Sequence, residues 1–449
     1  MDNKEERQPL NEYSDCLFYS CMTGYYMLRY NHNKEATNHM HLSKIKIQEI
    51  MEHQGISTFK ELAKQLDITP NQLSVMLSAN YNPLKSRVSD LCKILNTDIA
   101  SIVETDTIPN SNVIPSIDGD CVTAIELFAG AGGLALGLEQ AGINTLEYVE
   151  FDKACCETLK TNRPHWNVVC DDIHNVDFTI YKNKVDIVTG GFPCQAFSQA
   201  GKRLGFEDTR GTLFHEFARC VKEVQPKLFM AENVKGLLSH DNGRTLATII
   251  SVFEDLGYTI GNRKQILNAC YYGVGQKRER IVIVGIRNDI HTEFTYPTPE
   301  ETPTILREVL KDCPKSEGIA YSEKKRKVFE LVPPGGCWVD LPEAIAKEYM
   351  GKSYYSGGGK RGMARRISWD EPCLTLTCSP SQKQTDRCHP DEVRPFTVRE
   401  YARIQSFPDD WKFCGGIGSQ YKQIGNAVPV EMARRLGIQL INAIKNIKD

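Results

Sequence analysis

Two side chains that could do chemistry together each follow an apolar run of the chain. Cys194 ends the loop Gly190–Cys194, directly after the run Val185–Thr189, and Glu232 follows a second run at 227–230. Open α/β sheets place their chemistry at the carboxyl ends of neighbouring strands, so we expect the thiol and the carboxyl to share a pocket. A thiolate nucleophile and a carboxyl that donates a proton to a ring nitrogen would suit attack on an electron-poor ring.

A glycine-rich loop, Phe128–Leu134, separates an expected strand from an expected helix, and Glu150 lies twenty residues beyond Gly130. Glycines let a backbone approach a ligand closely, and an acid at the end of the second strand can accept from both ribose hydroxyls. The loop by itself predicts a nucleoside cofactor without specifying which one. The ring of Phe128 either packs in the core or lies near a sulfonium cation.

Two further segments carry candidate site residues. Gln276, Arg278 and Arg280 alternate just before the apolar run 281–285, which predicts that they point to one side of a strand. Two fixed guanidinium groups suit a phosphate or a developing anion, although a charged strand edge would show the same pattern. The segment Gln423–Pro429 predicts a tight turn into a helix.

Expected strands and helices alternate between residues 121 and 286. The strands are expected at 122–127, 145–150, 185–189, 228–230 and 281–286, and the helices at 134–141, 154–161, 213–224 and 245–256. This alternation predicts an α/β fold, with a mostly parallel sheet and helices on both of its faces.

Composition shifts divide the chain into six predicted parts. They are a tail (1–40), a helix-turn-helix domain (41–105), a polar linker (106–120), a catalytic domain (121–286), a loop-rich insertion (287–396) and a C-terminal return to the catalytic domain (397–449).

The part 41–105 has the signals of two short helices joined by a tight turn. Thr58 is followed three residues later by Glu61, a capping-box pattern, and Thr69 precedes Pro70 at the start of a second helix. The pattern resembles Cro/repressor-type domains, in which Asn71, Gln72 and Ser74 would lie on the helix that enters the major groove. The alternative is a small helical cap without DNA contacts.

The catalytic segments, in this order, resemble the DNA (cytosine-5)-methyltransferase family over about half of the chain, 121–286 and 397–435. The matching motifs are Phe-Ala-Gly-Ala-Gly-Gly, Gly-Phe-Pro-Cys-Gln, Glu-Asn-Val, Gln-x-Arg-x-Arg, Arg-x-x-x-Arg-x-Gln-Ser-Phe-Pro and Gly-Asn-Ala-Val-Pro. The resemblance implies a Rossmann-like, S-adenosylmethionine-dependent methyltransferase sheet, a cytosine flipped out of double-stranded DNA, and a target-recognition domain at 287–396.

Carried over by position, Cys194 resembles the nucleophile at C6 and Glu232 the residue that protonates N3, with Arg278 and Arg280 near the flipped base. Gln195 and Ser198 would lie in the loop that closes over DNA, and we also expect DNA contacts from Gln276, Arg361 and Arg365. The positions expected at the cofactor are Phe128, Ala129, Gly130, Gly132, Gly133, Leu134, Glu150, Phe151, Asp172, Ile173, Pro193, Asn426 and Ala427. The family's Gly-Asp-Ile is Asp171-Asp172-Ile173 here, which makes Asp172 the weakest of these assignments.

Composition excludes several other classes of protein. No apolar run is long enough for a membrane span, and no signal-peptide core follows the N-terminal residues. The net charge of −3 argues neither for nor against nucleic acid. The 16 cysteines show no zinc-ligand spacing, so we expect free thiols, no metal and a cytoplasmic location.

We therefore expect a bacterial site-specific DNA cytosine-C5 methyltransferase of a restriction-modification system, acting as a monomer, with an N-terminal domain that represses its own system and dimerises on operator DNA. The rival functions are tRNA cytosine methylation, a transcription regulator with a decayed enzyme domain, and an NAD-dependent oxidoreductase, which would explain only the glycine loop.

Overall fold

The chain divides into two compact units between Ile114 and Pro115. The computed structural model describes residues 39–77, 88–97, 99–106, 121–193, 212–262, 264–355, 362–383 and 385–448. Cys194, Gln195, Ser198 and Arg361 lie outside these ranges. Among the described residues, no helix combines the length and the apolarity that crossing a membrane requires. The described cysteines are free thiols.

The first unit is a small helical domain with a helix-turn-helix. Its helices are α2 (Lys44–His53), α3 (Phe59–Gln65), α4 (Pro70–Met76), α5 (Val88–Ile94) and α6 (Ile99–Ile102), and β1 (His39–Leu42) pairs antiparallel with β2 (Val103–Asp106). Both predicted caps are present. The hydroxyl of Thr58 accepts from the Glu61 N–H, and that of Thr69 accepts from the Gln72 N–H. Asp67 adopts a φ of 54° in the tight turn between α3 and α4.

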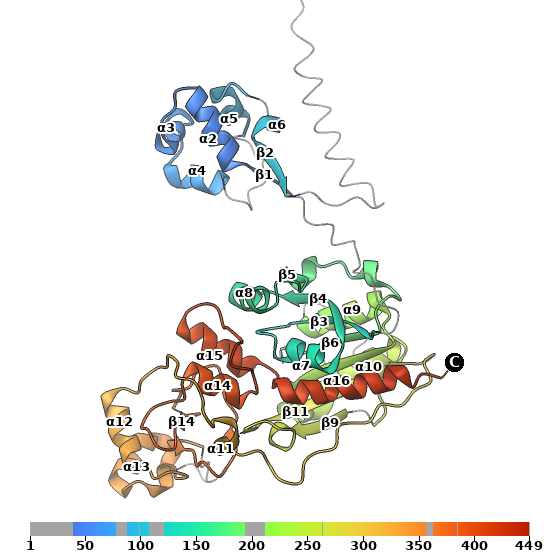
Figure 1. Cartoon of the computed structure of the whole chain (residues 1–449), viewed down its shortest axis with the longest axis vertical. Coiled ribbons are helices and arrows are strands. Elements are labelled where there is room, and N and C mark those ends of the chain that lie inside the picture. The colour runs from blue at the N-terminus through green and yellow to red at the C-terminus, as the bar shows by residue number, and fades with distance from the viewer. Residues whose placement is uncertain are drawn as a thin grey trace, which may run out of the picture. The chain divides into compact units, whose positions relative to one another are not determined.

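The second unit is built on one mixed sheet in the order β5-β4-β3-β6-β7-β11-β8, with β9 also paired to β11 (Figure 1). The strands β3 to β7 are parallel, and β11 runs antiparallel to β7. Their bounds are β3 (Thr123–Leu127), β4 (Asn144–Glu150), β5 (Val168–Cys170), β6 (Ile187–Gly190), β7 (Leu228–Val234), β8 (Tyr258–Thr259), β9 (Lys264–Asn268) and β11 (Glu279–Arg287).

Helices pack on both faces of the sheet because successive side chains of a strand point to opposite faces. Leu228 and Met230 of β7 share a core cluster with Leu134 and Leu138 of α7 (Gly133–Ala141) and with residues of α16 (Val430–Lys445). Phe229 stacks instead on Phe253 of α10 (Arg244–Asp255), next to α9 (Leu213–Val224). Figure 1 shows α16 alongside α7. The predicted α/β architecture is confirmed, as are the strands and helices expected between 122 and 286.

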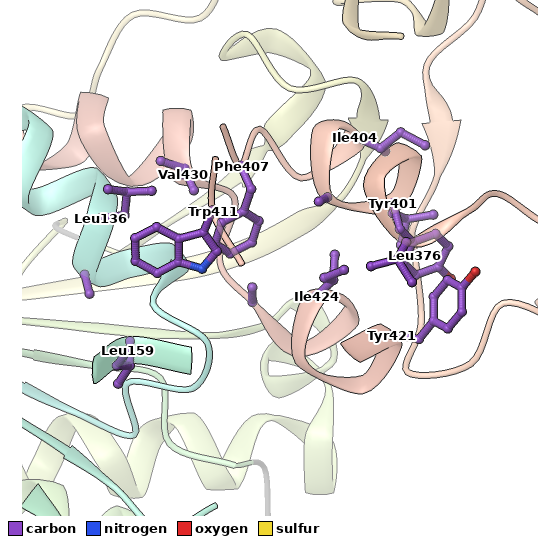
Figure 2. Close-up of a cluster of buried hydrophobic side chains, with 14 of the residues drawn as sticks. Leu136, Leu159, Leu376, Tyr401, Ile404, Phe407, Trp411, Tyr421, Ile424 and Val430 are labelled. Atoms are coloured by element: carbon purple, nitrogen blue, oxygen red, sulfur yellow. The ribbon is translucent and has the colours of Figure 1, made fainter. Parts of the chain in front are cut away.

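The segment after β11 contains short elements, and the chain then returns to the sheet. The short elements are α11 (Leu306–Val309), α12 (Glu323–Glu330), α13 (Glu343–Met350), β12 (Arg365–Arg366), β13 (Cys373–Leu374) and β14 (Arg387–Cys388). The return is made by α14 (Val398–Ile404), α15 (Ile417–Asn426) and α16. Figure 2 shows Trp411 and Phe407 against Leu136 of α7, with Leu159 of α8 (Lys153–Asn162) nearby, in one buried cluster. The C-terminal segment therefore belongs to the core of the sheet domain.

Candidate active site

A cavity of about 610 Å³ lies where the carboxyl ends of β3, β4, β6 and β7 meet β11 and α15. Its lining brings together segments that are up to 300 residues apart in the chain. The predicted site residues among that lining are Phe128, Ala129, Gly130, Gly133, Leu134, Glu150, Phe151, Pro193, Glu232, Arg278, Arg280, Asn426 and Ala427. The structure thus gathers most of the motif residues around one cavity.

The glycine loop leaves open space at the cavity. Gly130 has a φ of 54°, and a side-chain carbon placed there would meet nothing closer than the Phe128 carbonyl at 4.0 Å. The Gly130 N–H donates to Glu150 Oε2 at 2.7 Å, and Asp152 N–H donates to Glu150 Oε1 at 2.7 Å. These bonds fix the carboxylate of Glu150 at the cavity, where each oxygen keeps a further lone pair for a hydroxyl donor.

Phe151 presents a bare aromatic face at this end of the cavity. Its side chain is 73% exposed, which is unusual for a residue of its size. A fixed carboxylate can accept from ribose hydroxyls, an open glycine lets the backbone approach a ligand, and an exposed ring can contact a base. Together these three features fit a nucleoside. The residues at this end of the cavity therefore fit a nucleoside cofactor.

Three other expected cofactor residues do not line the cavity. Gly132 packs close to Leu159 and Trp411, and Ile173 is buried. The Asp172 carboxylate lies 2.5 Å from His174 Nδ1 and accepts from the His174 N–H, which lowers the pKa of Asp172. Gly132 and Ile173 therefore support the loop and the strand end through packing, and Asp172 is occupied by its neighbour.

The loop that leads to Cys194 is fixed up to Pro193 by its contact with β7. Asn233 Nδ2 donates to the Phe192 carbonyl at 2.8 Å. A side-chain carbon at Gly191 would lie 2.9 Å from Glu232 Oε2, so a larger residue at this position would displace the carboxyl. The chain therefore brings the residue before Cys194 to the cavity that Glu232 also lines.

Glu232 and Arg280 form an ion pair at the cavity. Arg280 Nε lies 2.8 Å from Glu232 Oε1, and their side chains are 12% and 13% exposed. Burial raises the pKa of Glu232 above its ordinary value of 4.5, while Arg280 and Arg278 oppose that rise. The neutral form of the carboxyl is thus favoured relative to a carboxyl in water.

Arg278 is buried behind this pair. It donates to the carbonyls of Leu376 and Gly425 at 3.3 and 3.0 Å, and burial lowers its pKa to about 9, which leaves it charged at neutral pH. Its Nε has no hydrogen-bond partner among the described residues. The Nε–H group of Arg278, which lines the cavity, is therefore available to donate a hydrogen bond.

The predicted alternation of Gln276, Arg278 and Arg280 is confirmed, but the assignment of Gln276 to DNA is wrong. Its side chain is fully buried and donates to Gln405 Oε1 at 2.6 Å, while its own oxygen accepts from the Leu376 N–H at 3.1 Å. Gln405 Nε2 in turn donates to the Ile424 carbonyl at 2.8 Å. These two amides form a brace, the Gln276–Gln405 pair, that joins the strand end to residues 374–378 and to α15.

The other predicted DNA contacts have different surroundings. Arg365 makes two short bonds to Glu371, at 2.6 and 2.7 Å, which leaves it engaged within the protein. In α4, Gln72 and Ser74 are exposed, while Asn71 lies at the start of the helix. The Gln72 side-chain oxygen accepts from the Thr69 N–H. The NH₂ group of the same amide is therefore the part left to donate to a base.

Sequence reasoning missed several residues of the cavity. Asp152 and Lys422 pair at 3.0 Å beside it, and Cys378 donates to Asn426 Oδ1. Outside the cavity, Gln405 belongs to the motif Arg-x-x-x-Arg-x-Gln-Ser-Phe-Pro, and its pairing with Gln276 was not predicted. The one local signal for Asp152 is its position directly after Phe151, at the end of the second strand. No local pattern marks Cys378. Among the described residues, no group of three or more His, Cys, Asp or Glu side chains is arranged to hold a metal ion.

The fold is of the Rossmann-like α/β class, with a nucleoside-type cavity at the carboxyl ends of its parallel strands. Two solved structures share the fold at a TM-score of 0.53. They are a DNA modification methyltransferase encoded within an Escherichia coli prophage, 24% identical and covering 72% of this chain and 100% of its own, and DNMT2 of Spodoptera frugiperda, 17% identical and covering 71% and 99%.

The chain belongs to the C-5 cytosine-specific DNA methylase family, whose profile matches residues 122–442, and it is a DNA (cytosine-5) methyltransferase. A Cro/C1-type helix-turn-helix DNA-binding domain matches residues 46–107. The Type II methyltransferase M.Sau96I of Staphylococcus aureus is 54% identical over 430 residues, which cover 90% of this chain and 99% of the relative. M.Eco47II of Escherichia coli is 56% identical over 340 residues, covering 74% and 81%.

Proposed function

We propose that this enzyme methylates C5 of a cytosine flipped out of duplex DNA, through a covalent bond between Cys194 Sγ and C6 of the base. The observation that carries the proposal is the Glu232–Arg280 pair beside Gly191, in the loop that precedes Cys194. A carboxyl whose neutral form is favoured can donate to N3, which draws electrons from the ring and opens C6 to a thiolate.

Six residues of the cavity then have a part in the reaction. Glu150, Phe151 and Asn426 hold the cofactor, and bound S-adenosylmethionine supplies the methyl group. Arg280 keeps Glu232 aimed at the base, while Arg278 places a fixed positive charge near the adduct. Water takes the C5 proton, the C6–Sγ bond breaks to release the thiolate, and N3 returns its proton to Glu232, which completes the cycle. The cost of unstacking the base is offset by pocket contacts.

The covalent step gives the direct test. The full-length protein is incubated with cofactor and duplex DNA that carries 5-fluorocytosine, which cannot lose a proton from C5. We expect a protein–DNA adduct that survives denaturation and maps to Cys194, and no adduct or methyl transfer with Cys194→Ala. An adduct at another residue, or transfer to tRNA in place of duplex DNA, would refute the proposal.

The first unit supports a second proposal, that it binds operator DNA and represses its own restriction-modification system in the cytoplasm. The supporting observation is a capped helix-turn-helix with exposed Gln72 and Ser74 on α4. Ser74→Glu, which adds a charge that DNA would repel, should abolish binding to the promoter region of the gene while methyl transfer persists. If binding to that region is unchanged, α4 is not the recognition helix.

A further inference from the structure

A second, more polar cavity adjoins the active site. It has a volume of about 470 Å³ and shares Val234, Arg280 and Thr375 with the lining of the first cavity. The rest of its lining comes from η4 (Lys235–Leu238), from β9, and from the residues just before and at the start of β11. Those residues are Lys235, Gly236, Asn268, Lys277 and Glu279.

The charges of this second cavity favour an anion. Three cations, Lys235, Lys277 and Arg280, line it together with one carboxylate, Glu279, and Arg280 is already paired with Glu232 of the first cavity. Lys235 Nζ is engaged with Glu279 at 2.9 Å. Lys277 is exposed, and its ammonium makes no hydrogen bond or ion pair with the residues that the structure describes. A bound anion would therefore gain an unpaired ammonium without first breaking an ion pair.

The hydrogen-bonding groups also suit an acceptor ligand. Asn268 Oδ1 accepts from the Arg278 N–H at 3.1 Å, which leaves the NH₂ end of the same amide as a donor. The carbonyl of Lys277 is already occupied, because the Thr375 hydroxyl donates to it at 2.6 Å. The donors left at this cavity are cationic or amide NH groups, which match phosphate oxygens.

We propose that this cavity seats a phosphate of the DNA backbone next to the target nucleotide, with Lys277 as its main cation. The inference rests on the proposed function, which puts the target base in the first cavity. Arg280 borders both cavities, and a nucleotide joins its base and its phosphate through one sugar. The Lys235–Glu279 pair limits the attraction of the empty cavity for other anions, since Glu279 neutralises one of its lysines.

The test measures methyl transfer by the full-length enzyme and follows the KM for duplex DNA as the salt concentration rises. Neutralising one phosphate contact should lower the slope of log KM against log salt by about 0.9. We expect that reduction, with a higher KM at low salt, for Lys277→Gln, whereas Lys277→Arg should keep the wild-type slope. Glu279→Gln should lower the KM and steepen the slope, because it frees Lys235.

Lys184→Gln is the matched control. Lys184 is an exposed lysine just before β6, at the amino ends of the parallel strands and so on the side away from the active site. The Lys184→Gln enzyme should behave like the wild type. Identical slopes for Lys277→Gln and Lys184→Gln would overturn the phosphate seat even though the enzyme methylates duplex DNA. Absence of methyl transfer by the wild-type enzyme would instead refute the proposed function.

Discussion

Arg280 Nε lies 2.8 Å from Glu232 Oε1, and the two side chains face each other from adjacent antiparallel strands, β7 and β11. Strand pairing therefore fixes the carboxyl of Glu232 from one side, and the close passage of Gly191 fixes it from the other. A carboxyl held in this way is positioned before any substrate arrives, which is the condition for efficient proton donation.

Glu232→Gln should lower the rate of methyl transfer by about 10²-fold or more, because the amide cannot give a proton to N3. Its free energy of unfolding should stay near that of the wild type, since the amide oxygen still accepts from Arg280. Single-turnover transfer and urea unfolding measure the two effects. Glu254→Gln, exposed on α10, is the control, and a Glu232→Gln enzyme of full activity would contradict the assignment.

The Gln276–Gln405 pair should position the cavity as well as stabilise it. Gln276→Leu or Gln405→Met alone leaves buried polar partners unsatisfied and should destabilise the protein by about 1–3 kcal/mol each. The double variant should lose less than the sum of the two, because it removes both members of the pair. Its kcat/KM should nevertheless stay low, since residues 374–378 and α15 have lost their connection. Gln265→Leu, exposed on β9, is the control.

The outcome of that double variant separates the two roles. If kcat/KM recovers in parallel with stability, as measured by urea unfolding, the amide pair is merely structural. If stability recovers and kcat/KM does not, the pair sets the geometry of the cavity.

Glu126 on β3 should make the stability of the protein fall as the pH rises. Its side chain is 1% exposed, neither oxygen has a partner among the described residues, and burial raises its pKa well above 4.5. The folded state therefore holds a proton that the unfolded chain loses. The associated stability is complete below pH 4.5 and is lost, at about 1.4 kcal/mol per pH unit, as the pH rises to the folded pKa.

Glu126→Gln should remove this dependence and raise the free energy of unfolding at neutral pH. Urea unfolding across the pH range measures it, with Glu157→Gln, exposed on α8, as the control. An unchanged pH profile in Glu126→Gln would mean that the carboxyl gains another partner in solution.

Gly137 should be required for the contact between α7 and α16. A side-chain carbon there would lie 2.4 Å from the Val430 carbonyl and 2.5 Å from Ala433 Cβ. Gly137→Ala should thus destabilise the protein by about 1–3 kcal/mol. Gly418→Ala, in the exposed first turn of α15 with no atom within 4 Å, should be neutral or stabilising by up to ~1 kcal/mol. Thermal unfolding of the two variants measures the difference. Equal unfolding midpoints for Gly137→Ala and Gly418→Ala would contradict the close packing of α7 on α16.

The amino-acid sequence by itself determined those features of the protein that depend on neighbours along the chain. The caps at Thr58 and Thr69 satisfy helix N–H groups within three residues, and the alternation of Gln276, Arg278 and Arg280 follows from the strand period. Strand-helix alternation likewise predicted the parallel sheet, and the order of the motifs predicted the family.

Only the tertiary structure decided which polar side chains face a ligand and which face each other. Gln276 pairs with Gln405 across 129 residues, and the two amides are buried because that partner exists. Arg365 is occupied by Glu371, whereas Lys277, in a segment that looks equally charged, is left exposed. The burial of a polar group depends on partners brought from distant segments, and no local pattern of residues records those partners.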